Sequence, residues 1–206
     1  MKYIIMCGGP RSEKPLRVVY NERLVERTIR LLKQYGIEDI AISSNNPAYE
    51  QFGVPVLRHR NSMTWDKFRW LHAFYKTDEP VCYLMGDVFY SPYAIRTIIG
   101  TETNDIEFFA SAPPFNTRWY IKNHAEPFAY KVQDVKHFWK CVKRTLWYNS
   151  RHYFYREAIT WELWQVIKGT PLNQIDYTNY TAINDYTTDI DSDEEAHRLE
   201  RRLKRL

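Results

Sequence analysis

The chain has 206 residues, 44% of them hydrophobic and 26% charged, and its formal net charge is +4. These values suit one globular domain with a real core, and the modest charge argues against a nucleic-acid partner. No apolar run approaches the roughly 20 residues that cross a bilayer, and the first residues lack the long apolar core of a secretory signal. We therefore expect a cytoplasmic domain with no membrane partner, of an oligomeric state that composition leaves open.

The first 60 residues follow a rhythm of strand, loop, helix and strand. Residues 3–7 are a short apolar run, typical of a parallel strand buried on both faces, and a Gly-Gly-Pro turn follows. Apolar residues recur at helical spacing over residues 24–35, with Gly36 placed to end the helix. A second strand over residues 40–43 completes a βαβ unit, whose crossover should be right-handed.

The same rhythm continues through the middle of the chain. The expected elements are a strand at 54–57, a helix at 64–75, a strand at 81–85, a helix at 92–99, strands at 107–110 and 128–132, and aromatic-rich helices at 135–146 and 158–168. This alternation predicts a single-domain α/β fold. We expect a mostly parallel Rossmann-like sheet, helices on both faces, and an aromatic-rich helical subregion.

The C-terminal part carries a local helix signal. Ser192 and Glu195 have the spacing of a capping box, so a helix should begin there. Its basic residues are Arg198, Arg201, Arg202, Lys204 and Arg205. They are interpreted as a solvated face that complements the helix dipole, with a binding arm as the alternative.

The loop CGGPRSEKPL after the first strand has the composition of a phosphate-binding turn. Gly8 and Gly9 would let backbone N–H groups approach a ligand closely, and Arg11 and Lys14 add positive charge. The loop lies at the carboxyl end of a parallel strand, where open α/β sheets bind ligands. It contains neither GxGxxG nor GxxxxGK[ST], so a plain tight turn stays the alternative.

Acidic residues stand at two further positions that suit a divalent cation. Asp87 follows Gly86 at the tip of the apolar strand 81–85, although a turn or capping role is the alternative. Asp189 and Asp191 alternate around Ile190, which places both on one side of an extended segment. The alternative for this acidic run is a solvated helix start.

The three cysteines, Cys7, Cys82 and Cys141, are widely spaced and lack CxxC or Cys/His ligand spacing. We expect buried thiols rather than a disulfide framework or a metal site.

Several segments together resemble the nucleotidyltransferase family of glycosyltransferase-A-like fold, particularly its small sugar-phosphate nucleotidyltransferases and phosphocholine cytidylyltransferases. MKYIIMCGG is similar to the family's opening strand and glycine turn, and KPL to the end of its signature loop. NERLVERTIRLLKQYGIEDIAISSNN resembles its first helix and second strand, YLMGDVFY its metal-aspartate strand, and TTDIDSDEEAHRLERRL its closing segment.

The resemblance implies a Mg²⁺-dependent transfer of a nucleoside monophosphate from an NTP, with CTP a candidate, to a small phosphorylated acceptor, releasing pyrophosphate. It implies Mg²⁺ on Asp87 and on Asp191, rather than Asp189, with Lys14 and Arg11 as catalytic cations. The implied nucleotide-binding residues are Cys7, Gly8, Gly9, Arg11, Lys14, Asn45 and Gly86. The implied acceptor-binding residues are Glu126, Tyr130, Lys131 and Trp161, with core packing as the alternative for the aromatic ones.

On this interpretation the single domain, residues 1–206, has three parts. Residues 1–100 form a nucleotide-binding half, 101–180 an acceptor-side region, and 181–206 the metal-aspartate segment and C-terminal helix.

Two other classes stay open. A glycosyltransferase of similar fold would carry D-x-D in the middle of the chain, whereas Met85 precedes Gly86-Asp87 and Asp189-Ile190-Asp191 lies near the end. A non-catalytic nucleotide-binding or partner-binding protein of the same fold is the other, because the glycine loop is shorter than the family's usual form.

Overall fold

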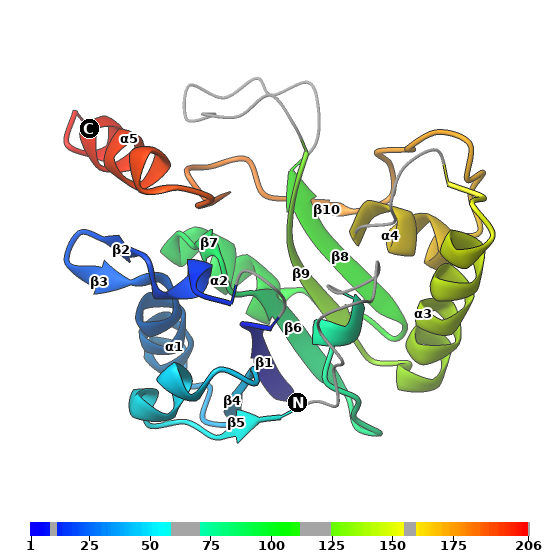
Figure 1. The fold of residues 1–206 in the computed structure, drawn as a ribbon, viewed down its shortest axis with the longest axis horizontal. Helices are drawn as coiled ribbons and strands as arrows, with labels where there is room; N and C mark the ends of the chain where they lie inside the picture. Colours follow the sequence, from blue (N-terminus) through cyan, green and yellow to red (C-terminus); the bar gives the residue numbers. More distant parts are fainter. Residues whose placement is uncertain (9–11, 59–70, 112–124, 155–159, 206) are drawn as a thin grey trace.

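The computed structural model describes residues 1–8, 12–58, 71–111, 125–154 and 160–205 (Figure 1). Its centre is a seven-stranded sheet of order β10-β8-β9-β6-β1-β4-β5. The strands are β1 (Lys2–Met6), β4 (Ile40–Ser43), β5 (Val56–Leu57), β6 (Val81–Met85), β8 (Ile106–Ser111), β9 (Glu126–Val132) and β10 (Thr181–Ala182).

The sheet is mostly parallel, as predicted. Strand β1 pairs in parallel with β4 on one side and with β6 on the other. Strand β9 runs antiparallel to its neighbours β6 and β8. Because β9 is reversed, its first residue lies at the edge where the parallel strands end.

Helices cover both faces of the sheet, which confirms the predicted α/β architecture. They are α1 (Leu24–Gln34), α2 (Pro92–Gly100), α3 (Val135–Ser150), α4 (Thr160–Lys168) and α5 (Asp193–Leu203). Successive strand residues point to opposite faces. On β9, the Tyr130 ring lies 5.8 Å from Phe138 of α3 and 6.3 Å from Trp164 of α4 between centroids, whereas Lys131 contacts the end of α2. Helices α3 and α4 therefore share one face, and α2 lies on the other, in contact with α1.

The C-terminal end of α1 explains why Gly36 marked the end of this helix in the sequence. Gly36 adopts φ 79°, and its N–H donates to the Lys33 carbonyl at 3.0 Å. The Ile37 N–H donates to the Leu32 carbonyl at 3.1 Å. These two bonds form a Schellman motif, whose left-handed residue favours glycine because it has no Cβ.

A second hydrophobic cluster, here called the small cluster, lies beside the main core. Its buried members are Val19, Leu24, Phe89, Ile190, Ala196 and Leu199. It joins α5 to two short ribbons: the hairpin of β2 (Val18–Val19) with β3 (Glu22–Arg23), and the pair of β7 (Val88–Phe89) with β11 (Thr188–Asp189). The small cluster thereby packs the C-terminal segment against the hairpin, the start of α1 and β7.

The hairpin tip also binds α5 directly. Tyr20 and Asn21 have φ of 53° and 60°, the left-handed pair that a type I′ turn requires. The Tyr20 N–H donates to Glu200 Oε1, and its hydroxyl donates to the Glu200 carbonyl, both at 2.7 Å.

Some predicted boundaries were wrong. The helix expected at 64–75 lies outside the described residues up to 70, and its described end is a short 3₁₀ helix, η3 (Leu71–Ala73), which stops before 75. The strand expected at 54–57 is confined to β5. The three cysteines are free and buried, as predicted.

Within the described part of the chain, none of the helices has the length and apolar character needed to cross a membrane.

Candidate functional site

Three side chains from distant parts of the sequence converge at the carboxyl edge of the sheet. Lys14 Nζ donates a hydrogen bond to Asp191 Oδ1 and lies 3.7 Å from Asp87 Oδ2. The Lys14 side chain is 12% exposed, and those of Asp87 and Asp191 are 33% and 39% exposed. The ammonium group is thus enclosed, while the carboxylates keep access to solvent.

Gly86 brings Asp87 and Lys14 together. Gly86 and Asp87 form the turn between β6 and β7, and the Gly86 N–H donates to the Met6 carbonyl at 3.1 Å. A Cβ on Gly86 would lie 2.5 Å from the Met6 carbonyl oxygen and 3.0 Å from Pro15 Cγ. Only glycine lets the end of β6 pack this closely on β1 and on the 3₁₀ helix η1 (Lys14–Leu16), which carries Lys14.

Asp191 is positioned by the pairing of β11 with β7. The Ile190 N–H donates to the Asp87 carbonyl at 2.8 Å, and the Ile190 side chain is fully buried in the small cluster. Because side chains alternate along an extended segment, Asp189 and Asp191 point away from that cluster. The Asp191 N–H donates to Glu195 Oε2 at 2.7 Å, and Ser192 caps α5 as predicted.

Glu126, the first residue of β9, fastens this segment to the sheet. It is 1% exposed, and its carboxylate accepts from the Thr188 hydroxyl at 3.0 Å and from the Asp189 N–H at 3.2 Å. The sequence had assigned Glu126 to acceptor binding; in the structure it supports the strand that carries the acidic pair.

The carboxylates of Asp87, Asp189 and Asp191 lie close enough to repel one another, so a positive charge stabilises this edge of the sheet. Burial raises the pKa of the Asp87 carboxyl, and the neighbouring charges of Asp189 and Asp191 raise it further, while Lys14 opposes the shift. The carboxylates are therefore held together at a cost that Lys14 offsets only in part.

The residues present fit a divalent cation such as Mg²⁺. Asp87 and Asp191 offer hard oxygen donors around one position of positive charge, and Mg²⁺ is commonly held by one or two carboxylates together with substrate phosphates and water. Elsewhere among the described residues, Asp105, Asp134 and His137 also place ligand atoms within 4.8 Å of one another on the surface.

The other predicted nucleotide-binding residues are distributed as follows. Cys7 is 1% exposed, and burial raises the pKa of its thiol. Its N–H donates to the Ser43 carbonyl and its carbonyl accepts from the Ser44 hydroxyl, both at 2.9 Å, so its backbone groups bond within the protein. Gly8 is half-buried at the end of β1, whereas Gly9 and Arg11 lie outside the described residues. Asn45 is exposed, and its carbonyl accepts from Arg58 Nη1 at 3.0 Å.

The remaining predicted acceptor-binding residues do not reach this edge. Tyr130 is fully buried and its hydroxyl donates to the Thr160 carbonyl at 2.5 Å, while Trp161 is 1% exposed in the main core. Lys131 Nζ donates to the carbonyls of Ile98, Ile99 and Thr101, at the end of α2. A cation suits the carbonyl-rich end of a helix, so Lys131 acts as a helix cap here.

Arg17 was missed by the sequence analysis. Its Nε lies 3.3 Å from Asp193 Oδ1, linking the end of η1 to the first turn of α5. The sequence signal that could have identified Arg17 is its position three residues after Lys14 in a charged loop.

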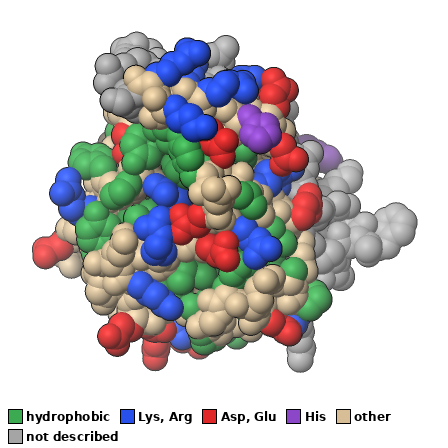
Figure 2. Space-filling view, turned by 90° about the vertical axis from the view of Figure 1, so that its left-hand side faces the viewer, with side chains coloured by type: hydrophobic (Ala, Val, Ile, Leu, Met, Phe, Trp, Pro, Cys, Tyr) green, Lys and Arg blue, Asp and Glu red, His purple; other side chains and the backbone are tan. Residues whose placement is uncertain are grey.

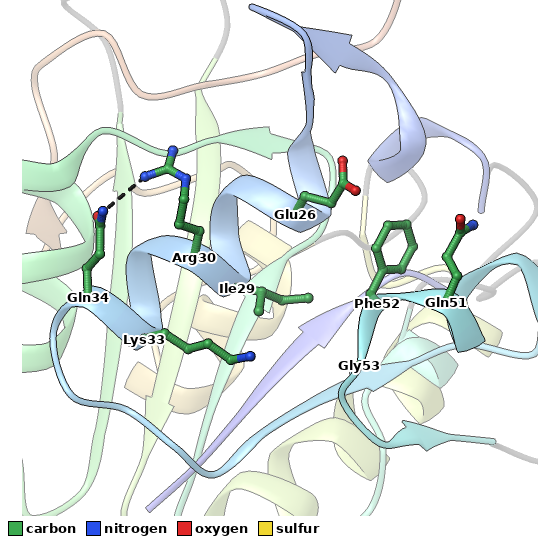
Figure 3. A pocket seen from close by; sticks show the side chains of 8 residues that line it. All are labelled: Glu26, Ile29, Arg30, Lys33, Gln34, Gln51, Phe52 and Gly53. Atoms are coloured by element: carbon green, nitrogen blue, oxygen red, sulfur yellow. Dashed lines mark hydrogen bonds between the residues drawn. The ribbon is translucent and has the colours of Figure 1, made fainter.

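A separate cavity of about 660 Å³ lies between α1 and the 3₁₀ helix η2 (Pro47–Phe52) (Figure 3). Its lining residues are Glu26, Ile29, Arg30, Lys33, Gln34, Gln51, Phe52 and Gly53. It includes none of the three converging side chains, and Arg30 is occupied by ion pairing with Glu22 at 2.6 Å. We do not assign the site to this cavity, because Lys14, Asp87 and Asp191 lie elsewhere.

The sequence matches no protein-family model and no curated protein. Solved structures nevertheless share its fold. The 4-diphosphocytidyl-2C-methyl-D-erythritol synthase from Anaerococcus prevotii matches with a TM-score of 0.61 at 14% identity, over 98% of this chain and 95% of that one. The CTP:phosphocholine cytidylyltransferase from Streptococcus pneumoniae matches with a TM-score of 0.57 at 16% identity, over 98% of both chains.

The fold is that of nucleotidyltransferases. A protein from Bacillus anthracis described as a glucose-1-phosphate thymidylyltransferase matches as well, with a TM-score of 0.54 at 15% identity, over 98% of this chain and 95% of that one. The resemblance predicted from the sequence is confirmed for the fold. Because a shared fold does not determine function, the reaction and the substrates have to be argued from the residues of the site.

Proposed function

We propose that this chain is a Mg²⁺-dependent nucleotidyltransferase that transfers a nucleoside monophosphate from an NTP to a small phosphorylated acceptor and releases pyrophosphate. One observation supports the proposal above others: Lys14, Asp87 and Asp191, drawn from both ends and the middle of the chain, meet at the ligand-binding edge of a nucleotidyltransferase fold. The free, buried thiols and the need for NTP favour a cytoplasmic enzyme.

The proposed reaction needs no nucleophile from the protein. An acceptor phosphate oxygen attacks the α-phosphorus in line, and the bond to the β-phosphate oxygen breaks as pyrophosphate leaves. Asp87 and Asp191 would hold Mg²⁺, which supplies charge neutralisation at the α-phosphate. Lys14 and the backbone N–H of Gly8 bind the departing phosphates, with Arg11 proposed for the same role. Glu126 keeps Asp191 in place through β11.

The test is a screen of the four NTPs against sugar phosphates, phosphocholine and phosphonates, scored by pyrophosphate release with Mg²⁺ present. Asp87→Asn and Asp191→Asn should each nearly abolish turnover in the productive combination. The double variant should be scarcely worse than either single one, because members of one catalytic unit are strongly non-additive. Asp189→Asn, a matched loss of one charge two residues from Asp191, should be milder.

The panel also includes nucleotide sugars, because Asp189-Ile190-Asp191 lies beside Asp87 and fits the D-x-D of a glycosyltransferase. Sugar release from a nucleotide sugar without pyrophosphate formation from any NTP would move the assignment to that class. Full turnover in Asp191→Asn would show that the acidic run only begins α5.

A further inference from the structure

The helix α3 carries a concentration of positive charge that its own stability does not explain. Its sixteen residues include Lys136, Lys140, Lys143 and Arg144, and no Asp or Glu. Like charges three or four residues apart destabilise a helix, and a cation in the first turn opposes the helix dipole. The outward side of α3 is therefore electrostatically unfavourable in the isolated chain.

These cations have no acidic partner among the described residues. Neither they nor Lys76, which lies beside α3, make an ion pair within the described part of the chain. The basic residues of α5 differ. Arg198 pairs with Glu194 at 3.1 Å, and blue and red side chains are interspersed on the side of the molecule that carries α5 (Figure 2).

Aromatic side chains share the basic surface of α3. At 100° per residue, Trp147 falls on the same stripe as Lys136, Lys140 and Lys143. Trp147 is 50% exposed, and Tyr153, stacked on it at 5.6 Å between centroids, is 56% exposed. Large rings left in solvent inside a cationic stripe indicate a contact surface.

An apolar hollow adjoins this stripe. A cavity of about 550 Å³ lies between α3 and the segment that contains Lys76 and Asp78. Its apolar lining residues, Val135, Trp139, Val142 and Leu146, are spaced as one stripe of α3, and lysines border it. Asp78 is the acid of this lining, and Asp134 and Asp105 lie near the first turn of α3.

We propose that the outer face of α3 docks on a bilayer surface that carries anionic lipid head groups. A bilayer surface offers both things that this face lacks, namely negative charge for the lysines and an apolar layer for Trp147, Tyr153 and the hollow. Trp and Tyr are the side chains that favour the head-group level of membranes, and lysine stems extend from there to the phosphates. A nucleic acid would satisfy the charges but leave the aliphatic hollow unfilled.

The proposal replaces the expectation of no membrane partner, and it does not rest on the proposed catalytic function. Helices α3 and α5 lie on opposite sides of the molecule (Figure 1). Docking through α3 would therefore leave the edge that carries Lys14, Asp87 and Asp191 uncovered.

The test is co-sedimentation of the full chain with vesicles of phosphatidylcholine alone or mixed with phosphatidylglycerol. The wild type should pellet with the mixed vesicles and stay in the supernatant with the neutral ones, and added salt should weaken binding. The variant Lys136→Gln/Lys140→Gln/Lys143→Gln should lower the partition coefficient by roughly 100-fold. The matched variant Arg201→Gln/Lys204→Gln/Arg205→Gln, with the same loss of charge at α5, should bind like the wild type.

Fluorescence quenching by brominated lipids reports on insertion. The chain has seven tryptophans, of which Trp147 and Trp139 lie on the proposed docking face. Quenching should be strong in the wild type and clearly reduced in Trp147→Phe, which keeps an aromatic ring, and the quenching that remains should come from Trp139. Unfolding midpoints like the wild type establish that each variant is folded. Failure to pellet with anionic vesicles, or equal losses in the two triple variants, would refute the proposal. So would α3-dependent binding of a short RNA without vesicle binding, which would assign the face to nucleic acid.

Discussion

The ammonium group of Lys14 stands where a divalent cation would also find its carboxylate ligands. It contacts Asp191 directly and lies 3.7 Å from Asp87. The single positive charge of Lys14 relieves part of the repulsion between the two carboxylates. The proposed reaction, however, requires the same ammonium group at the departing phosphates. Under the proposed function, metal and nucleotide binding would be coupled, because Lys14 would exchange the carboxylates for the phosphates when a divalent cation binds.

We predict that Lys14→Met binds a divalent cation more tightly than the wild type when no nucleotide is present. The substitution removes the competing charge and leaves both carboxylates, so Mn²⁺ affinity should rise by roughly tenfold, the scale of one charge-assisted contact. Electron paramagnetic resonance of free Mn²⁺ measures it. Lys33→Met, on the exposed side of α1, is the control. Turnover of Lys14→Met should fall, and an unchanged Mn²⁺ affinity would show that Lys14 does not occupy the cation position.

A second prediction concerns Asp87 and pH. Its raised pKa means that the folded state binds the proton more tightly than the unfolded state, so ionisation of Asp87 destabilises the fold. This loss is absent below the ordinary aspartate range near about 4 and grows as pH rises through that range. Asp87→Asn should therefore be as stable as the wild type at low pH and more stable near neutrality, although inactive. Urea unfolding across this pH range tests it, and a variant less stable at neutral pH would reverse the sign.

At the scale of elements, the site depends on short ribbons rather than on long strands. The pair β7–β11 has two residues on each side, and Glu126 adds two hydrogen bonds to it from β9. An element this short has little stability of its own, so its side-chain fastening decides where Asp191 lies.

We predict that Glu126→Ala costs about 1–3 kcal/mol in the free energy of unfolding, because it leaves buried donors without their acceptor. Turnover should fall more than nucleotide affinity does, since Asp191 loses its support while Lys14 and η1 keep theirs. Thr188→Val, which removes one of the two donors, should lie between wild type and Glu126→Ala. A loss of stability with unchanged turnover would separate β11 from the site. Urea denaturation and steady-state kinetics supply both measurements.

The sequence predicted the long elements well and the short ones poorly, for a physical reason. Strands β4 and β6 were placed with their observed ends, because continuous apolar runs mark buried parallel strands. Ribbons of two residues have no period to detect, so β2, β3, β7 and β11 were missed. The reversal of β9 was also not expected, since its apolar run looks the same in either direction.

The convergence of three side chains at one edge of the sheet was predictable from their residue types and chain positions, while their roles stay a prediction. Asp87 and Asp191 each stand next to a strand or helix end that the pattern located, Lys14 lies in the charged loop after the first strand, and the structure brings the three together. Tyr130 and Lys131 failed to reach the site because neighbouring strand residues point to opposite faces, and both faces are covered by helices. One-dimensional spacing does not say which face a side chain takes when both are buried.

At the scale of the whole molecule, we predict that NTP and Mg²⁺ together stabilise the fold. A ligand that binds only the folded state at roughly one hundred times its Kd adds about 2.7 kcal/mol. EDTA should remove most of this gain, and Asp191→Asn should show little of it. Thermal unfolding with each NTP, with and without EDTA, provides the measurement. Stabilisation indifferent to EDTA would mean that nucleotide binds without the acidic pair.

The contact between Lys14 and Asp191 spans 177 positions of the sequence. Synthesis on a ribosome delivers Asp191 long after Lys14 and Asp87, so a nascent chain can assemble β1, β4 and β6 while one carboxylate is still missing. Closing so long a loop carries an entropic cost that β11, the small cluster and α5 must together overcome. Under the proposed function, a chain interrupted before Asp191 would retain β1, β4 and β6 but lack one of the two carboxylates proposed to hold Mg²⁺, so catalysis would begin only when synthesis is almost finished.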